Sequence, residues 1–195
     1  MYNMGMKNER LTKATISYIE ALFKGSSDGH DADHSLRVFR NAMNIASSYP
    51  EADPDLIALA SLLHDVDDHK LFHTENNSNA RSFLEDHGVS EDKVEQIVKI
   101  INSVSFSKNK GKTPDTLEAK IVQDADRLDA MGAIGIARTF AYGGKKGRSL
   151  EDSVQHFHDK LLLLKDRLNT REARDLAEKR HDFMIKFLEE LKKEI

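Results

Sequence analysis

The sequence predicts an all-α fold. Residues that interrupt helices are few, because the 195 residues include only 3 Pro and 10 Gly. The alternation of β-branched and polar residues that is typical of strands is nearly absent. Apolar residues recur instead at helical spacing, as Val38, Ala42 and Ile45 do. Together these observations favour a bundle of helices.

The first half of the chain contains five segments with helical character. Residues 9–24 are expected to form a helix that ends at Gly25, before a flexible link. Asp53 and Pro54 open the third helix, because Asp caps free amides and Pro fits the first turn. This third helix is apolar nearly all round, so it belongs at the centre of the bundle. The second, third and fourth helices are expected at residues 32–48, 55–67 and 76–87. The fifth is expected to begin at Ser90.

The second half begins with a basic, polar loop over residues 105–113. A sixth helix then starts at Thr113-Pro114 and continues past Met131. Glycines interrupt the next stretch, and we expect its KKGR segment, residues 145–148, to be mobile. Two long amphipathic helices follow, at 149–168 and 171–194. This C-terminal pair either packs on the core or forms a homodimer interface.

Composition excludes several classes of function. The absence of Cys excludes disulfides, thiolate nucleophiles and thiolate zinc sites, and it suits a cytoplasmic protein. Lys and Arg are scattered and the formal net charge is −4, so we expect no nucleic-acid partner. No apolar run approaches the ~20 residues of a membrane span, and the N-terminus has no signal-peptide core. We expect one cytoplasmic domain over residues 1–195 and no membrane partner.

The adjacent pair His64-Asp65 is the first candidate site. The pair lies at the end of the apolar third helix, where a buried carboxylate needs a compensating charge. A bound metal would supply that charge, with its other ligands coming from other helices. Taken alone the pair is weak evidence, because a helix end held by a hydrogen bond explains it more simply.

Two further helices carry residues that suit a metal site. His34 lies in the second helix, where Val38 predicts that this turn faces the core. The sixth helix carries DADRLDAMG, in which Asp124, Asp126 and Asp129 are crowded together. Crowded acids indicate a cation site or a solvated face, and the apolar stripe along this helix argues against a solvated face.

A His, a distant His-Asp pair and a later Asp, each on its own helix, resemble the HD superfamily of metal-dependent phosphohydrolases. The matching segments are HDADHSLRV, LASLLHDVDDHK and IVQDADRLDAMG, within about residues 30–142. The chain also resembles small bacterial HD hydrolases in which a GIARTFAYGG-like stretch follows. The resemblance implies a single HD-domain helical bundle with a C-terminal helical extension over about residues 149–195.

The resemblance also implies a metal site, whose ligands are His34, His64, Asp65 and Asp126. Family members place the last ligand in an Ala-Asp-Arg-Leu-like segment, which favours Asp126. The helical wheel favours Asp124 instead, because Asp124 lies on the apolar stripe that includes Leu128. Asp126 is preferred, and Asp124 stays the alternative.

The ligand set predicts which metals suit the site. Two imidazoles and two carboxylates without sulfur suit Mn²⁺, Fe²⁺, Co²⁺, Ni²⁺ or Mg²⁺. Some relatives bind a second ion through a His-His pair after the fifth helix, where this chain reads KIINSVSFSK. One divalent ion is therefore expected, and the alternative is that His69 and His73 bind a second ion.

The metal would lower the pKa of water and polarise a phosphoryl oxygen. Asp65 is predicted to be catalytic as a ligand. Asp68 is predicted to handle the proton because it lies nearly one helical turn later, where related nucleotidases also carry an acid. The alternative interpretation is that Asp68 simply belongs to the exposed end of a helix. The predicted substrate-binding residues are Arg37, Arg127, Arg138 and Arg148, of which Arg127 is also a candidate, with Asp129, for orienting the ligands.

The predicted function is hydrolysis of a small phosphomonoester, such as a nucleotide, by metal-activated water. Hydrolysis of (p)ppGpp is an alternative, because the ADRL segment resembles those enzymes. Those enzymes carry a Glu-Asp pair after the His-Asp motif, however, and only part of that pair is present here in Val66-Asp67-Asp68-His69. A metal- or nucleotide-sensing module without activity is the other alternative, and the intact ligand set argues against it.

Overall fold

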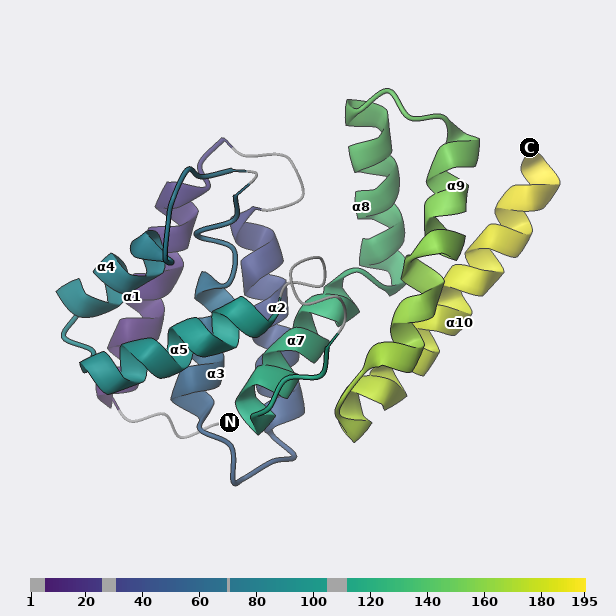
Figure 1. The fold of residues 1–195 in the computed structure, drawn as a ribbon. Coiled ribbons are helices and arrows are strands. Elements are labelled where there is room, and N and C mark those ends of the chain that lie inside the picture. The colour runs from purple at the N-terminus through teal and green to yellow at the C-terminus, as the bar shows by residue number, and fades with distance from the viewer. Residues whose placement is uncertain (1–5, 26–30, 70, 105–111) are drawn as a thin grey trace.

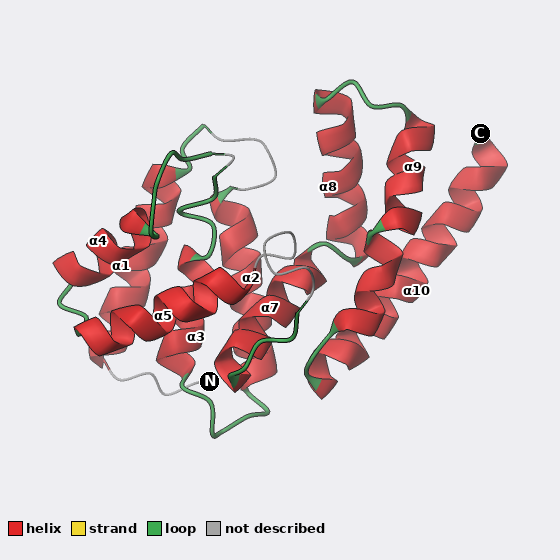
Figure 2. Ribbon diagram, viewed as in Figure 1, coloured by secondary structure: helices red, strands yellow, loops and turns green. Residues whose placement is uncertain are grey.

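The computed structural model describes residues 6–25, 31–69, 71–104 and 112–195, and the regular structure in these ranges is entirely helical (Figure 2). The predicted all-α fold is therefore confirmed. The helices of the N-terminal half are α1 (Met6–Leu22), α2 (Ala32–Ala46), α3 (Pro54–Leu63), α4 (Ser78–Asp86) and α5 (Glu91–Val104). Those of the C-terminal half are α7 (Leu117–Asp129), α8 (Gly132–Lys145), α9 (Leu150–Asp159), the 3₁₀ helix η1 (Leu161–Arg167) and α10 (Arg171–Glu194). None of the described helices has the length and apolarity of a membrane span.

Side-chain caps explain where the helices near the candidate site begin. Asp53 accepts hydrogen bonds from the N–H groups of Asp55 and Leu56 at the start of α3, as predicted. Asp31 caps α2 by accepting a hydrogen bond from the N–H of His34 at 2.7 Å. Such caps satisfy N–H groups that have no partner within the helix. The cap at Asp31 therefore fixes the turn that carries His34.

Helix α3 forms the centre of the N-terminal bundle. Its residues from Leu56 to Leu63 are all buried, and it packs against α1, α2, α5 and α7 (Figure 1). Each fully buried Leu or Ile contributes about 1.5–3 kcal/mol relative to an exposed one. The helix ends at Leu63 rather than at the predicted Asp67, so His64 and Asp65 lie in the turn that follows it.

Helices α8, α9 and α10 lie together beside the bundle (Figure 1). The rings of Phe140, Phe157 and Phe187, one from each helix, have centroids 5.8–6.5 Å apart. Helix α10 also packs against α7. The C-terminal helices therefore pack on the core of the same chain.

The prediction of one helix over residues 149–168 is wrong. Helix α9 ends at Asp159, and Lys160 leaves the helical region with φ −140° and ψ −58°. The chain continues as η1, which buries Leu161 and Leu164. The two leucines are therefore buried by a 3₁₀ segment and not by a continuation of α9.

The KKGR segment, residues 145–148, forms a hydrogen-bonded helix end. The N–H of Arg148 donates to the carbonyl of Gly143 at 2.8 Å, and that of Gly147 donates to Gly144 at 3.2 Å. Gly147 has a φ of +66°, a left-handed conformation that glycine adopts at little cost. These two bonds form the Schellman pattern that commonly ends helices.

Candidate metal centre

The ends of three helices bring the predicted metal ligands together. His34 lies in the first turn of α2, and Asp126 lies in the last turn of α7. His64 and Asp65 follow the end of α3 directly. Helix α2 packs against both α3 and α7. These ends therefore meet at one place in the bundle.

The ligating atoms of these side chains lie close to one another. The Nε2 atom of His34 is 3.2 Å from Nε2 of His64. It is also 3.4 Å from Oδ2 of Asp65 and 3.4 Å from Oδ1 of Asp126. The Nε2 atom of His64 is 3.5 Å from Asp65 Oδ2 and 3.9 Å from Asp126 Oδ1. Because the His34 side chain is 3% exposed and that of Asp126 is 29% exposed, the cluster is open to solvent at Asp126.

The opposite ring nitrogens are engaged in hydrogen bonds. Nδ1 of His64 lies 2.8 Å from the carbonyl oxygen of Ser61, to which it donates. Nδ1 of His34 lies 2.7 Å from Oδ2 of Asp129. With the proton on Nδ1, each neutral ring directs the lone pair of Nε2 into the cluster. Two such lone pairs 3.2 Å apart repel each other unless they share a cation.

The donor set fits a divalent metal ion. Ligands at about 2.0–2.2 Å from a tetrahedral or octahedral ion lie about 2.8–3.6 Å from their neighbours. Most of the observed separations fall in this range. His34, His64 and Asp126 each offer one atom within 4.8 Å of the others, and Asp65 borders both rings. Nitrogen and oxygen donors without sulfur suit Mn²⁺, Fe²⁺, Co²⁺, Ni²⁺ or Mg²⁺.

Asp129 orients His34 from the side opposite the cluster. Its buried carboxylate accepts hydrogen bonds from His34 Nδ1 at 2.7 Å, Arg37 Nε at 2.7 Å and Arg138 Nη1 at 2.5 Å. Burial raises the pKa of Asp129, but the hydrogen bonds with His34 and Arg37 and the charge of Arg138 hold it well below its usual range. Asp129 is therefore an anion that fixes the ring of His34.

The cluster favours positive charge. Burial lowers the pKa of His34, but hydrogen bonds with Asp126 and Asp129 and the charge of Asp65 raise it to about 9. Burial raises the pKa of Asp126, but the hydrogen bond with His34 and the charge of His64 bring it below its ordinary value. The carboxylates thus stabilise a cation among these groups, either a proton or a metal ion.

Comparison with known proteins decides the family. The family model of the HD domain matches residues 31–131. This chain belongs to the HD-domain family. The resemblance predicted from the sequence is thereby confirmed, and HD domains bind divalent metal ions.

Several known proteins are similar over nearly the whole chain. The YpgQ protein of Bacillus subtilis (strain 168) is 39% identical, and the match covers 97% of this chain and 96% of YpgQ. The crystal structure of Bacillus subtilis YpgQ in complex with ADP matches with a TM-score of 0.82 and 37% identity, covering 94% of this chain and 97% of that one. An HD-superfamily hydrolase from Bacillus thuringiensis matches with a TM-score of 0.78 and 38% identity, covering 97% and 98%.

Two aspartates of α7 have different surroundings in this HD domain. The carboxylate of Asp124 accepts hydrogen bonds from the N–H groups of Asn169 at 2.8 Å and Thr170 at 2.7 Å, and from the Thr170 hydroxyl at 2.8 Å. Asp126 faces the two histidines instead. Asp124 therefore anchors the start of α10. The helical wheel favoured it because α7 is buried on more than one face.

Arg37 and Arg138 are brought to the cluster through Asp129. Their side chains are 26% and 28% exposed, so both reach solvent beside the cluster. Arg138 Nη1 also lies 3.1 Å from Nδ1 of His34. The two guanidinium groups come from different helices, α2 and α8.

The other two predicted arginines lie in different surroundings. Arg127 is buried, and its guanidinium donates a hydrogen bond to the backbone oxygen of Arg167 in η1. Burial lowers the pKa of Arg127, although the charge of Asp124 opposes that shift. Arg148 lies over the ring of Tyr142, 5.8 Å from its centroid. The contacts of Arg127 and Arg148 are thus with the C-terminal helices.

Asp67 and Asp68 differ although they are adjacent. Asp67 accepts hydrogen bonds from the N–H groups of Asn79 and Ala80, both at 3.0 Å, and so holds the start of α4. The N–H of Asp68 donates to the carbonyl of Asp65 at 3.0 Å, which places Asp68 in the turn after the His-Asp pair. Its side chain is partly buried.

Sequence reasoning missed Ser61 and Arg180. The backbone carbonyl of Ser61 accepts a hydrogen bond from His64, and such a contact does not depend on the type of side chain. Arg180 of α10 donates to the carbonyl of Leu128 at 2.5 Å and to Asn41 Oδ1 at 3.1 Å. Its aliphatic part lies against Gly132, where a Cβ would come within 3.0 Å of Arg180 Cγ. Arg180 therefore links α10 to the junction between α7 and α8, next to Asp129.

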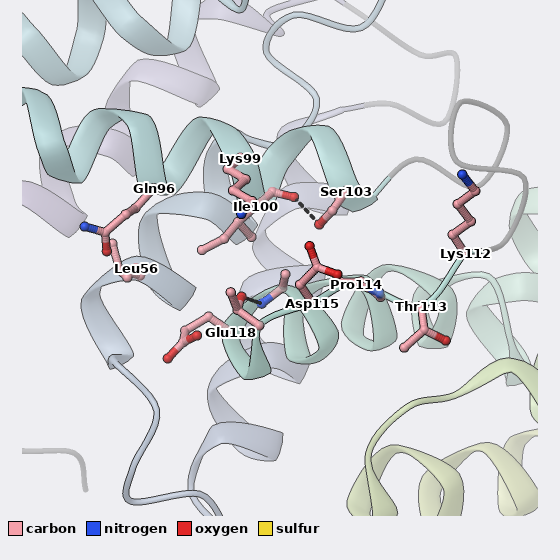
Figure 3. A pocket seen from close by; sticks show the side chains of 12 residues that line it. Leu56, Gln96, Lys99, Ile100, Ser103, Lys112, Thr113, Pro114, Asp115 and Glu118 are labelled. Carbon is pink, nitrogen blue, oxygen red and sulfur yellow. Dashed lines mark hydrogen bonds between the residues drawn. The ribbon is translucent and has the colours of Figure 1, made fainter.

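A cavity of about 350 Å³ lies elsewhere, between α5 and the start of α7 (Figure 3). Lys99, Ser103, Asp115 and Glu118 are among its lining residues, and the lining includes none of the cluster's side chains. Glu118 accepts a hydrogen bond from the backbone of Asp53 at 3.1 Å. This cavity is therefore separate from the metal centre.

Proposed function

We propose that this HD-domain protein hydrolyses a small phosphomonoester, a nucleotide, using one divalent ion bound by His34, His64, Asp65 and Asp126. The observation that carries the proposal is the pair of Nε2 atoms 3.2 Å apart, which are flanked by carboxylates and belong to rings whose Nδ1 atoms contact Asp129 and the Ser61 carbonyl. Two partly exposed arginines lie beside this pair. A cation site next to guanidinium groups suits phosphate chemistry.

A divalent ion at this site supplies Lewis-acid activation of water and neutralises phosphoryl oxygens. The protein's part is to hold the ligands in the correct state. Asp129 and the Ser61 carbonyl keep the protons of His34 and His64 on Nδ1. Both Nε2 atoms are thereby oriented for ligation.

Arg37 and Arg138 are assigned to binding the phosphate. Both contact Asp129, and both are partly exposed beside the cluster. Guanidinium N–H groups match phosphate oxygens in a bidentate arrangement. These residues would orient the phosphoryl group toward the attacking water.

Asp68 is assigned to proton transfer. In the hydrolysis, the water oxygen forms a bond to phosphorus, the ester P–O bond breaks and the alcohol leaves. A carboxylate accepts the proton of the attacking water, and the same group can return it to the leaving oxygen. The position of Asp68 in the turn that follows Asp65 supports this role.

The nucleotide class is proposed from the comparison with YpgQ, whose crystal structure is in complex with ADP at 37% identity to this chain. Hydrolysis of (p)ppGpp has weaker support. The acidic segment after the His-Asp pair is only partly like that of those enzymes, and its Asp67 holds the start of α4. The substrate test separates the two.

The test is release of phosphate, and of pyrophosphate from ppGpp, by metal-stripped protein with Mn²⁺, Mg²⁺, Co²⁺ or Ni²⁺ restored. Substrates are AMP, ADP, ATP, ppGpp and a chromogenic phosphomonoester. The expected result is metal-dependent release of phosphate from AMP that Asp65→Ala abolishes. Asp68→Asn should lower kcat about 100-fold while metal binding is retained. Metal binding without release from any of these substrates would favour a sensing role and contradict the proposal.

A further inference from the structure

One face of α8 carries an aromatic side chain that the proposed reaction does not use. Ile134, Arg138 and Tyr142 are spaced by four residues, so they lie along one side of the helix. Arg138 reaches Asp129 and His34 at the metal centre. Tyr142 is 40% exposed and Ile134 is 42% exposed. Because four helical residues advance about 6 Å, Tyr142 lies one turn beyond the arginine.

Two cations lie over the ring of Tyr142. Lys146 Nζ lies 5.7 Å from its centroid, and the guanidinium carbon of Arg148 lies 5.8 Å from it. Arg148 is held there because its N–H closes the end of α8 on the carbonyl of Gly143. The ring and its neighbouring charges therefore have a defined placement.

An exposed ring of this kind is a platform for another π system. Aromatic side chains stack on bases of any sequence, and nearby cations add attraction for an anionic ligand. The occupant must also suit Arg138, which lies one turn away at the phosphate-binding end of the same face. A nucleotide carries both groups, a phosphate and an aromatic base joined by a ribose.

We propose that Tyr142 stacks on the base of the nucleotide whose phosphate is bound at Arg138 and the metal centre. Lys146 and Arg148 supply positive charge beside the base and ribose. This inference rests on the proposed function and adds a determinant of specificity to it. The site would then favour nucleotides over sugar phosphates that lack a base.

The test compares AMP with ribose 5-phosphate, which keeps the sugar and phosphate but has no base. Tyr142→Ala should lower kcat/KM for AMP about tenfold and leave that for ribose 5-phosphate within about twofold of the wild-type value. Tyr142→Phe should restore most of the AMP activity, because it keeps the ring. Leu163→Ala, which removes an exposed apolar side chain from η1, should change neither value. Equal losses for both substrates, or no loss with AMP, would overturn the inference.

A binding measurement separates this inference from the proposed function. Calorimetry with Mn²⁺-loaded protein gives the Kd of ADP without any need for turnover. Tyr142→Ala should weaken ADP binding about tenfold. If ADP binding weakens in this way but no nucleotide is hydrolysed, the base site stands and the proposed reaction fails. If wild type and Tyr142→Ala bind ADP equally, or wild type does not bind it, the base site is wrong whatever the hydrolysis shows.

Discussion

The Nδ1 atom of His34 lies 2.7 Å from Oδ2 of Asp129, although 95 positions separate them in the chain. The contact joins the first turn of α2 to the last residue of α7. Arg37 and Arg138 hold the same carboxylate. Asp129 therefore connects a proposed metal ligand to the two residues proposed to bind phosphate.

Asp129→Asn is predicted to weaken Mn²⁺ binding by about 10–100-fold, as is typical when a group that orients a metal-bound His is changed. The amide removes the negative charge that fixes the ring and balances the arginines. Calorimetric titration of the metal-stripped variant measures the effect. Asp175→Asn, a change at an exposed position of α10, is the matched control and should bind Mn²⁺ like the wild type. Equal affinity in both variants would show that Asp129 does not support the site.

Asp124→Asn is predicted to destabilise the fold by about 2 kcal/mol and to leave metal binding intact. Both carboxylate oxygens of Asp124 accept hydrogen bonds from Asn169 and Thr170. The NH₂ group of Asn would face donors at one of these positions. Urea unfolding gives the loss of stability, and Mn²⁺ titration gives the stoichiometry. Loss of metal binding in a folded Asp124→Asn protein would show that Asp124 is a metal ligand.

Metal affinity is predicted to rise with pH. The pKa of His34, about 9 without a metal, means that its ring is protonated at neutral pH. A metal ion requires the neutral ring, so binding displaces the proton. The apparent affinity should therefore increase about tenfold per pH unit between pH 6.5 and 8.5 and level off above the pKa. Calorimetry in two buffers of different ionisation enthalpy should find one proton released per Mn²⁺ at pH 7.5. A pH-independent affinity with no proton release would contradict the placement of His34 in the site.

Gly135→Ala is predicted to lower stability by about 1–3 kcal/mol. A Cβ at this position would collide with the carbonyl oxygen of Ala130, at the junction between α7 and α8. Gly144→Ala is the matched control in the same helix, because a Cβ there meets nothing within 4 Å. The control should be neutral or stabilising by about 0.5–1 kcal/mol. Thermal unfolding of the two variants decides whether the packing at Gly135 matters.

Much of the fold could be predicted from local patterns in the sequence. Asp53 and Pro54 mark the start of α3 by chemistry that acts within one turn, and the structure agrees. The break at Lys160 carries no such signal, because neither Gly nor Pro interrupts the pattern there. Lys160 leaves the helical region and the chain continues as η1, and no residue type in the sequence marks this change.

The candidate site was predictable in its residue types and less so in its geometry. The pattern of His34, His64-Asp65 and a later Asp predicted which residues would meet. The choice between Asp124 and Asp126 could not be made from a helical wheel, because α7 buries more than one face. Contacts through backbone carbonyls, such as that between Ser61 and His64, cannot be recognised from residue types, because every residue has a backbone carbonyl.

The central claim is that His34, His64, Asp65 and Asp126 bind one divalent ion on which hydrolysis depends. Equilibrium dialysis of metal-stripped protein against Mn²⁺, followed by metal analysis, tests it most directly. We expect one ion per chain in the wild type and none in Asp126→Asn, with both proteins folded. Failure of the wild type to bind Mn²⁺, Co²⁺ or Ni²⁺, or unchanged binding in Asp126→Asn, would contradict it.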